Sequence, residues 1–309
     1  MKCLGIDTSN YTTSAALYDT VTGEVFQKRR LLKVKPGEIG LRQSDAVFQH
    51  TVALPEILKE LYEEKNTVPD VIGVSVSPRD EEGSYMPCFM TGKGAADSLG
   101  TVFGVPVKYF SHQAGHIAAA IYSAGKLGMK DEEFLAFHVS GGTTEAVRVM
   151  PDKEKVFSVE LAASSLDLKA GQAVDRTGAI LGLPFPAGPE LDKLARESRR
   201  QFRLHPFMKD GSCSLSGIEN KCRQMKEAGE PDCDIARFCI EYIRAALSLM
   251  TDALIEKYPG RPLVYSGGVM SNSLIRESFA EKYNAVFAQN GFSSDNAVGI
   301  AVLAGCVAE

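Results

Sequence analysis

Residues 3–28 read CLGIDTSNYTTSAALYDTVTGEVFQK, and residues 134–161 read FLAFHVSGGTTEAVRVMPDKEKVFSVEL. Each stretch opens with an apolar run, passes through a small polar turn, and continues as two strand-like runs joined by a hairpin turn. Each is followed by helical segments and then by a short apolar strand that ends in small residues, at 71–77 and 262–268. The repetition predicts two α/β lobes that both begin with a three-stranded meander.

Two such lobes in one chain are typical of the duplicated fold of actin, sugar kinases and Hsp70, in which a nucleotide lies in a central cleft. The alternative is two unrelated α/β domains with ordinary hairpins. We expect lobes at 1–111 and 112–309, with a helix-rich insertion at about 168–258 in the second lobe. We also expect the last helix, at 296–307, to pack back on the first lobe.

The composition is that of an ordinary globular protein. Of 309 residues, 34 are Lys or Arg and 39 are Asp or Glu, so the formal charge is −5. A hydrophobic content of 44% with 24% charged residues excludes a disordered chain or a fibre. No apolar run is long enough for a membrane span or a signal peptide. The seven cysteines are odd in number and form no C-x-x-C pair, so we expect a reduced, cytoplasmic protein.

Two histidines stand four residues apart, at His112 and His116. On a helix this spacing places both imidazoles on one face, as two ligands of one metal ion require. A chance pair is the alternative. Asp295 is a candidate third ligand, or else the N-cap of the last helix. Two histidines with a carboxylate suit zinc or ferrous iron. Gln113 stands where the zinc-protease signature H-E-x-x-H has its Glu, which argues against proteolysis.

Several small polar segments are candidates for binding a nucleotide. Glycines in the turn after the strand 134–139 allow backbone N–H groups to approach a phosphate or an acyl oxygen, although a purely structural turn has the same sequence. Asp175 is a candidate for the ribose hydroxyls, or else an ion-pair partner on a solvated face. Asn272 is a candidate for the ribose or base, or else a helix cap. The turn comprises Val139, Ser140, Gly141, Gly142 and Thr143.

Basic residues gather in two places, at 28–42 and at 193–203. The second cluster comprises Lys193, Arg196, Arg199, Arg200 and Arg203. A solvated surface is the simpler interpretation. The functional one is a strip that contacts RNA phosphates, whose affinity would fall steeply with salt.

In order along the chain, these segments resemble the motifs of one family, the tRNA threonylcarbamoyladenosine transferases. The family is also known as O-sialoglycoprotein endopeptidases, peptidase family M22. The resemblance runs from Leu4 to about Val302 and covers six motifs, which is highly specific. The matching segments are Gly5 to Ser9, Ser111 to His116, Val139 to Thr144, Ala170 to Arg176 with Leu181 to Pro189, Gly267 to Asn272, and Asp295-Asn296.

The resemblance implies a reaction and a set of site residues. It implies transfer of a threonylcarbamoyl group from threonylcarbamoyl-adenylate to the adenosine beside the tRNA anticodon, without a nucleophilic side chain. It implies one divalent metal, iron or zinc, on His112, His116 and Asp295. It places the adenylate on Val139 to Thr143, Asp175, Gly188 and Asn272. It also implies tRNA, a paralogous actin-like subunit and a P-loop ATPase as partners.

The sequence departs from the family pattern in ways that indicate a divergent paralogue. No acid follows Thr8-Ser9, since Tyr11 and Thr12 occupy the place of the family's acids, and Ala114 replaces the Glu of the metal helix. Thr143 replaces the His of the glycine turn, and Glu219 replaces a Lys. The alternative function is therefore a nucleotide- and metal-binding paralogue that acts as a partner or regulator without transfer.

Overall fold

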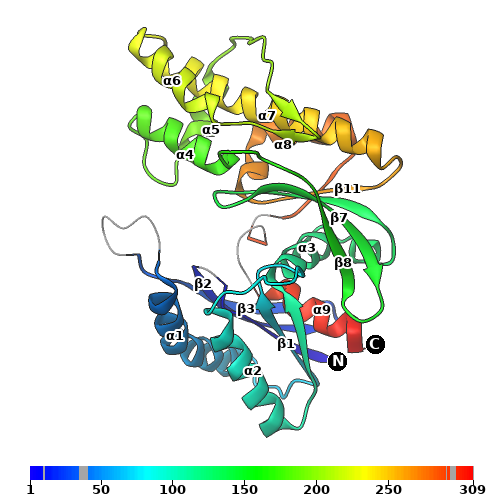
Figure 1. Cartoon of the computed structure of the whole chain (residues 1–309). Helices are drawn as coiled ribbons and strands as arrows, with labels where there is room; N and C mark the ends of the chain where they lie inside the picture. Colours follow the sequence, from blue (N-terminus) through cyan, green and yellow to red (C-terminus); the bar gives the residue numbers. More distant parts are fainter. Residues whose placement is uncertain (10, 35–40, 290, 293–296, 309) are drawn as a thin grey trace. The chain divides into compact units, whose positions relative to one another are not determined.

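A computed structural model describes residues 1–9, 11–34, 41–289, 291–292 and 297–308 (Figure 1). The chain forms two compact units. Unit 1 comprises Met1–Glu132, Met150–Val159 and Gln289–Glu309, and unit 2 comprises Glu133–Val149 and Glu160–Ala288. By this division residues 112–132 group with unit 1, whereas the sequence predicted a boundary at 111. The physical reason is that the helix following residue 111 packs against the last helix of the chain.

The sheet of unit 1 has the strand order β3-β2-β1-β4-β5. Its first three strands form an antiparallel meander, and β4 and β5 add to it in parallel on the other side of β1. The strands are β1 Lys2–Asp7, β2 Thr12–Asp19, β3 Val25–Leu31, β4 Val71–Ser77 and β5 Val107–Ser111. Parallel strands need a crossover, and helices α1 (Gln43–Glu64) and α2 (Phe89–Phe103) supply the two crossovers here.

Side chains of the strands in unit 1 point alternately to the two faces of the sheet, and helices pack on both faces. Leu4 and Ile6 of β1 join a buried cluster with Leu54 and Ile57 of α1, on the face covered by α1 and α2 (Figure 1). On the opposite face, Gly5 allows the backbone of α9 (Val298–Ala308) to lie directly on the sheet. The end of β1, Asp7, is thereby fixed between two layers of helices.

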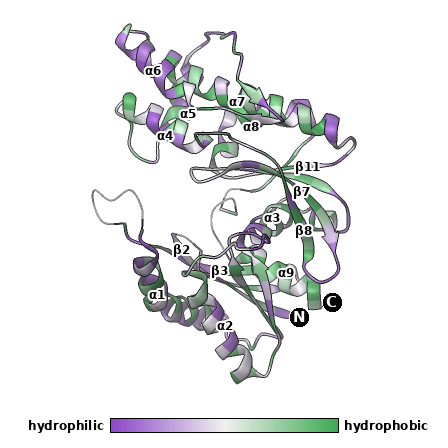
Figure 2. Ribbon diagram, viewed as in Figure 1, coloured by the Kyte–Doolittle hydropathy of each residue, from purple (hydrophilic) through white to green (hydrophobic). Residues whose placement is uncertain are grey.

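Helix α9 is apolar along almost its whole length, because it is buried between the sheet and helix α3 (His112–Ser123) (Figure 2). The two helices cross at Gly115 and Gly299. A Cβ on Gly299 would lie 1.8 Å from the carbonyl oxygen of Gly115, so no larger residue fits without moving a backbone. Within the described residues, no helix is both long and apolar enough to span a bilayer.

The second sheet, most of which lies in unit 2, repeats the plan of the sheet of unit 1. Its order, read from the meander outward, is β8-β7-β6-β11-β12, with β11 parallel to both β6 and β12. The strands are β6 Phe134–Val139, β7 Thr144–Asp152, β8 Val156–Ser164, β11 Leu263–Ser266 and β12 Val286–Phe287. The predicted duplicated α/β architecture is therefore confirmed.

The predicted helix-rich stretch of unit 2 contains four helices within the described chain, together with a short hairpin that the sequence did not indicate. The helices are α4 Ala170–Ile180, α5 Gly188–Glu197, α6 Gly217–Glu227 and α7 Asp232–Lys257. The hairpin pairs β9 (Met208–Lys209) with β10 (Ser212–Cys213) around a turn at Gly211. Its strands are too short for an alternating pattern, and a bridge from Cys213 to Ser165 ties it to the rest of the unit.

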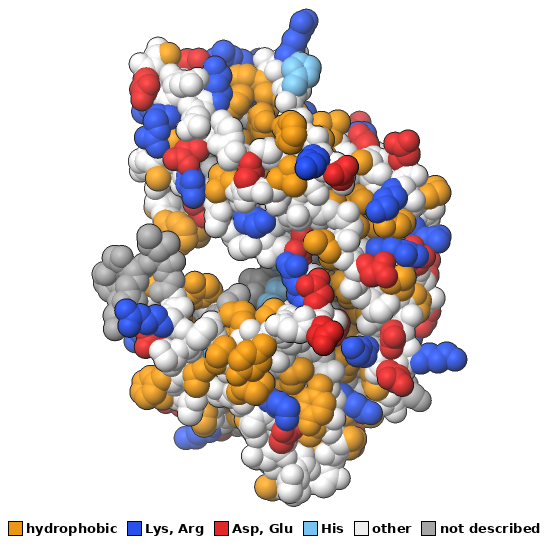
Figure 3. All heavy atoms as spheres, viewed as in Figure 1, with side chains coloured by type: hydrophobic (Ala, Val, Ile, Leu, Met, Phe, Trp, Pro, Cys, Tyr) orange, Lys and Arg blue, Asp and Glu red, His pale blue; other side chains and the backbone are white. Residues whose placement is uncertain are grey.

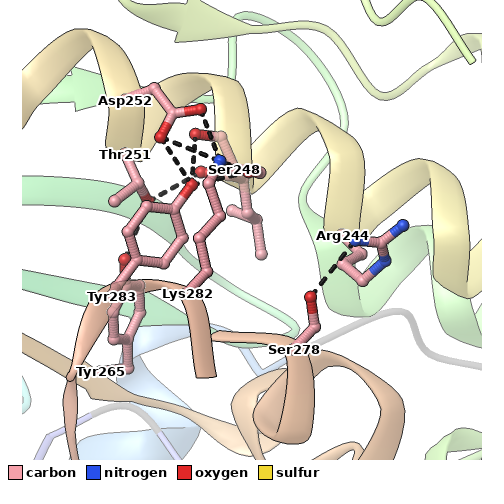
Figure 4. Close-up of polar contacts among 9 residues, drawn as sticks. Arg244, Ser248, Thr251, Asp252, Tyr265, Ser278, Lys282 and Tyr283 are labelled. Atoms are coloured by element: carbon pink, nitrogen blue, oxygen red, sulfur yellow. Dashed lines mark hydrogen bonds and ion pairs between the residues drawn. The ribbon is translucent and has the colours of Figure 1, made fainter. Parts of the chain in front are cut away.

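Polar side chains join α7 to α8 (Ser273–Tyr283) and to β11 (Figure 4). The hydroxyl of Tyr283 lies 2.6 Å from Ser248 Oγ and donates to Asp252 at 2.8 Å. The buried hydroxyl of Tyr265 on β11 lies 2.8 Å from Thr251 Oγ1. These hydrogen bonds satisfy tyrosine hydroxyls that the aromatic core would otherwise leave unpaired.

Candidate functional site

In unit 1, the candidate metal-binding residues lie where β5 runs directly into α3. Ser111 is the N-cap of α3, and its hydroxyl accepts the backbone N–H of Ala114 at 3.2 Å. His112 and His116 therefore occupy the first and second turns of the helix, on one face, as predicted. Ser111 also contacts a carboxylate oxygen of Asp80 at 3.1 Å. The cap fixes the helix start, and thereby the position of His112.

The two imidazoles converge on each other through one nitrogen of each ring. Nε2 of His112 lies 2.9 Å from Nε2 of His116, with the ring planes at 74°. Two metal–nitrogen bonds of about 2.0–2.1 Å that meet near a right angle separate their nitrogens by about 2.9 Å. This separation is compatible with two ligands of one ion, and it is equally that of a hydrogen bond between the two rings.

The opposite nitrogen of His112 faces a buried carboxylate that the sequence analysis did not select. Nδ1 of His112 lies 3.1 Å from Oδ2 of Asp7, which is fully buried. The hydroxyl of Ser9 donates to the same oxygen at 2.9 Å, and Ser75 donates to Oδ1. A carboxylate acceptor favours the proton on Nδ1 and leaves the lone pair of Nε2 for a metal. The sequence signal was an aspartate placed directly after an apolar strand.

The imidazole nitrogens of His112 and His116 fit a divalent metal as ligands but do not complete its coordination. A carboxylate behind a histidine is the usual support of a metal-bound imidazole. Within the described residues, no three His, Cys, Asp or Glu side chains form a metal-binding group, since Asp7 faces Nδ1 of His112 and not the Nε2 pair. Asp295, the predicted third ligand, lies outside the described residues.

In unit 2, the turn between β6 and β7 presents backbone N–H groups. Ser140 and Thr143 close the turn, because the N–H of Ser140 donates to the carbonyl of Thr143 at 2.7 Å and the hydroxyl of Ser140 accepts the N–H of Thr143 at 3.2 Å. Gly141 and Gly142 at the tip are exposed, and a Cβ on either would meet no described atom within 4 Å. No side chain at either position therefore stands in the way of an anionic ligand that approaches the tip of the turn.

Close backbone contacts hold this turn in place. A Cβ on Gly171, at the start of α4, would lie 2.5 Å from the backbone nitrogen of Gly141. A Cβ on Gly267 would lie 2.2 Å from the carbonyl oxygen of Val139, and Gly267 also has a positive φ of 97°. Both positions thus require glycine. The predicted segments around 139–143, 170–176 and 267–272 are brought together inside this unit.

The remaining predicted nucleotide ligands of unit 2 make structural contacts. Asp175 accepts the backbone N–H of Ala187 at 2.9 Å, next to Gly188 at the start of α5. Asn272 is the N-cap of α8 and accepts the N–H of Ile275 at 3.2 Å, as the capping alternative predicted. It also donates to Asp192 of α5 at 2.9 Å. The start of α5 and the start of α8 are thereby tied together.

Charged groups around α4 form a separate structural layer. Arg176 binds Glu219 of α6 at 2.7 Å, and this hydrogen bond lowers the pKa of Glu219. Before α4, burial acts to raise the pKa of Asp167, but hydrogen bonds from Ser214, Leu215, Ser216 and Leu168 outweigh it and lower this pKa to about 2. These contacts anchor the loop that leads into α4.

Two buried cysteines, Cys3 and Cys213, have thiols that are not activated. Burial raises the pKa of Cys3 and of Cys213 to about 12, so both stay protonated near neutral pH. All seven cysteines are free thiols.

Comparison with solved structures defines the class of fold. The chain matches full-length HypF with a TM-score of 0.63 at 14% identity, over 99% of this chain and 55% of that one. It matches component A of (R)-2-hydroxyglutaryl-CoA dehydratase from Acidaminococcus fermentans with a TM-score of 0.56 at 15% identity, over all of both chains. It matches the ROK hexokinase of Thermus thermophilus with a TM-score of 0.54 at 15% identity, over 99% and 98%. The chain thus has the actin and sugar-kinase type of fold.

Sequence comparison defines the family. The profile of tRNA N6-adenosine threonylcarbamoyltransferase matches residues 20–302. A probable bifunctional tRNA threonylcarbamoyladenosine biosynthesis protein of Methanocaldococcus jannaschii is 27% identical, over 98% of this chain and 55% of that protein. The tRNA N6-adenosine threonylcarbamoyltransferase of Buchnera aphidicola (strain Tuc7) is 26% identical, over 98% and 92%. The chain therefore belongs to the tRNA N6-adenosine threonylcarbamoyltransferase family, and it spans about half the length of the archaeal relative.

Proposed function

We propose that this protein transfers a threonylcarbamoyl group from threonylcarbamoyl-adenylate to the exocyclic amine of the adenosine next to the tRNA anticodon. The observation that carries the proposal is the match of the family profile to residues 20–302. Both sequence relatives named above carry tRNA threonylcarbamoyladenosine chemistry in their names. In this proposal the protein acts on tRNA in the cytoplasm.

The reaction is an acyl transfer that balances without an enzyme nucleophile. The amine nitrogen forms a bond to the carbamoyl carbon, the bond from that carbon to the phosphate oxygen breaks, AMP leaves, and one proton is released. Because AMP is a good leaving group, the protein has to position the two substrates and stabilise the charge that develops on oxygen.

In this proposal, His112, His116 and Asp295 hold one divalent metal, iron or zinc. The metal, when bound, supplies a Lewis acid for substrate oxygens. The contact of 3.1 Å between Asp7 and His112 Nδ1 supports it, because it fixes the tautomer that leaves Nε2 unprotonated. Ser9 and Ser75 keep Asp7 in place by donating to both of its oxygens.

The adenylate is assigned to unit 2. Gly141 and Gly142 offer backbone N–H groups to the phosphate or the carbamoyl oxygen, in the turn Val139 to Thr143. The start of α5, at Gly188, adds the positive end of a helix dipole. Asp175 and Asn272 act here by holding the ends of α5 and α8, and Asp175 retains a second carboxylate oxygen for a ribose hydroxyl.

The test is analysis of tRNA nucleosides after reaction with threonylcarbamoyl-adenylate. We expect threonylcarbamoyladenosine with the unaltered protein and its partners, which we propose are a paralogous actin-like subunit and a P-loop ATPase. His112→Ala and His116→Ala should abolish it, whereas Asp97→Ala, a control on exposed α2, should not. Absence of product beside an active family member would refute transfer.

A second candidate function, supported by the departures from the family pattern, is a nucleotide- and metal-binding paralogue that regulates without transferring. Ala114, which replaces the family's Glu on the metal helix, is buried at 3% exposure. Glu219, which replaces a Lys, is bound to Arg176 and Arg223. This candidate predicts that the protein binds AMP in calorimetry but gives no product, and that restoring Ala114→Glu gains no turnover.

A further inference from the structure

An irregular segment of unit 2 joins α5 to β9 and alternates in exposure like an extended chain. Arg203, His205 and Phe207 are exposed, while Phe202, Leu204 and Pro206 turn inward. Lys209 of β9 continues the exposed series, and Arg199 precedes it. We use the name basic edge for five exposed side chains, which are Arg199, Arg203, His205, Phe207 and Lys209. Arg200 and Gln201 are also exposed.

The backbone of this segment is fixed by its inward side chains. Phe202 packs on Phe238 of α7, edge to face, with ring centroids 5.4 Å apart, and the guanidinium of Arg200 lies 5.0 Å from the Phe202 ring. At its ends, Ser198 Oγ donates to Asp234 at 2.5 Å, and the carbonyl of Phe207 accepts the N–H of Ser214 at 3.0 Å. These contacts therefore hold the inward side of the segment against α7 and the hairpin and leave the outward side chains exposed.

The structure separates the basic residues of 193–209 into two groups. Lys193, Arg196 and Arg200 bind acidic partners, at Glu190, at Glu277, and at Glu230 with Asp234. Arg199, Arg203 and Lys209 make no side-chain hydrogen bond or ion pair with any described residue. Acids do flank the segment, at Glu197 and Asp210. Over most of the face of the protein drawn in Figure 3, acidic and basic side chains are interspersed.

An aromatic ring stands among these cations. The side chain of Phe207 is 61% exposed, although it follows the buried Pro206 and precedes a hairpin that could have covered it. Exposed aromatic rings between cations are the arrangement that binds single-stranded nucleic acid, since bases stack on the ring while the cations contact phosphates. Cations alone would be explained by a surface that only contacts water. The exposed ring of Phe207 has no such explanation, because contact with water does not stabilise an apolar side chain.

We propose that the basic edge binds the single-stranded part of an RNA substrate, with Phe207 as a stacking platform and Arg199, Arg203 and Lys209 as phosphate contacts. The inference rests on the proposed function for the choice of RNA, whose unpaired anticodon loop presents both bases and phosphates. It assigns the segment 199–209 a role that the transfer chemistry itself does not require.

The experiment measures binding of an anticodon stem-loop RNA to the full chain by fluorescence anisotropy at several salt concentrations. The triple variant Arg199→Ala, Arg203→Ala, Lys209→Ala should weaken binding at least ten-fold and reduce the slope of log affinity against log salt by about 2. Phe207→Ala should weaken binding about five-fold or more and leave that slope unchanged. A role that is only structural would not separate these two effects.

The matched control removes three ion-paired cations of the same unit, with Lys193→Ala, Arg223→Ala and Lys226→Ala. An equal loss of affinity and slope in both triple variants would refute the basic edge, because charge alone would explain it. Unchanged RNA binding in the first triple would refute it as well.

The same proteins also report separately on the proposed function. Calorimetry with AMP should give the same affinity for all variants, which shows that they are folded. If the basic-edge variants lose RNA affinity while the unaltered protein makes no threonylcarbamoyladenosine, the RNA-binding role of the basic edge is supported and the proposed transfer is refuted. If the unaltered protein makes threonylcarbamoyladenosine and the basic-edge variants bind RNA with unchanged affinity, only the RNA-binding role of the basic edge is refuted.

Discussion

The contact between α3 and α9 allows one substitution to test the packing that supports the histidine pair. Gly299→Ala places a methyl group 1.8 Å from the carbonyl oxygen of Gly115 and 2.9 Å from the backbone nitrogen of Ala119. Both opposing atoms are backbone, so no side chain can turn aside. The helices would have to separate by about 1.5 Å to regain ordinary contact.

The expected loss of stability follows from two opposed effects. Overpacking of a close contact costs about 1–3 kcal/mol, and here the upper end applies because the obstacle is a helix backbone. Alanine regains about 1 kcal/mol over glycine through helix propensity. We therefore expect the free energy of unfolding to fall by about 2 kcal/mol. Because Gly115 lies between His112 and His116, the separation should also disturb the imidazole pair.

Urea unfolding of the full chain measures the first effect, and competition with a chromophoric chelator for zinc measures the second. The matched control is Gly94→Ala on α2, where a Cβ meets open space, and it should raise stability by about 0.5–1 kcal/mol. If Gly299→Ala and Gly94→Ala had the same free energy of unfolding, the helices α3 and α9 would be able to move apart at no cost. The packing argument would then be wrong.

Three further outcomes follow from the same contacts. Asp7→Asn should weaken zinc binding about 10- to 100-fold in the chelator competition, since an amide no longer selects the Nδ1–H tautomer of His112, and an unchanged affinity would contradict this. Gly171→Ala should displace the glycine turn and weaken AMP binding in calorimetry at least ten-fold, whereas equal affinity would show that the turn is not used. Asp167→Asn should lower stability at pH 7 by about 1 kcal/mol. Because its pKa is lowered in the fold, that difference should vanish as the pH falls from about 4 to 2, and a difference that persists at pH 2 would contradict this.

The duplicated architecture could be predicted from local patterns in the amino-acid sequence. Periodicity at 3–28 and 134–161 is local, and both meanders formed where the alternation placed them, within a few residues at their ends. The histidine spacing was equally local, because an i, i+4 pair on a helix shares a face whatever surrounds it. Asn272 was correctly predicted to be a candidate helix cap for the same reason.

Contacts between residues far apart in the chain could not be predicted in this way, because they depend on how the elements pack. Asp7 reaches His112 because β1 and β5 belong to one sheet, and no pattern near either residue encodes that pairing. Likewise, the cations at 193–203 look alike in sequence, but only those that lie opposite acids on α7, on α8, in the loop before α7 or within their own helix form ion pairs. Local sequence fixes backbone propensity and side-chain direction, whereas the free energy of a contact depends on partners that only folding brings together.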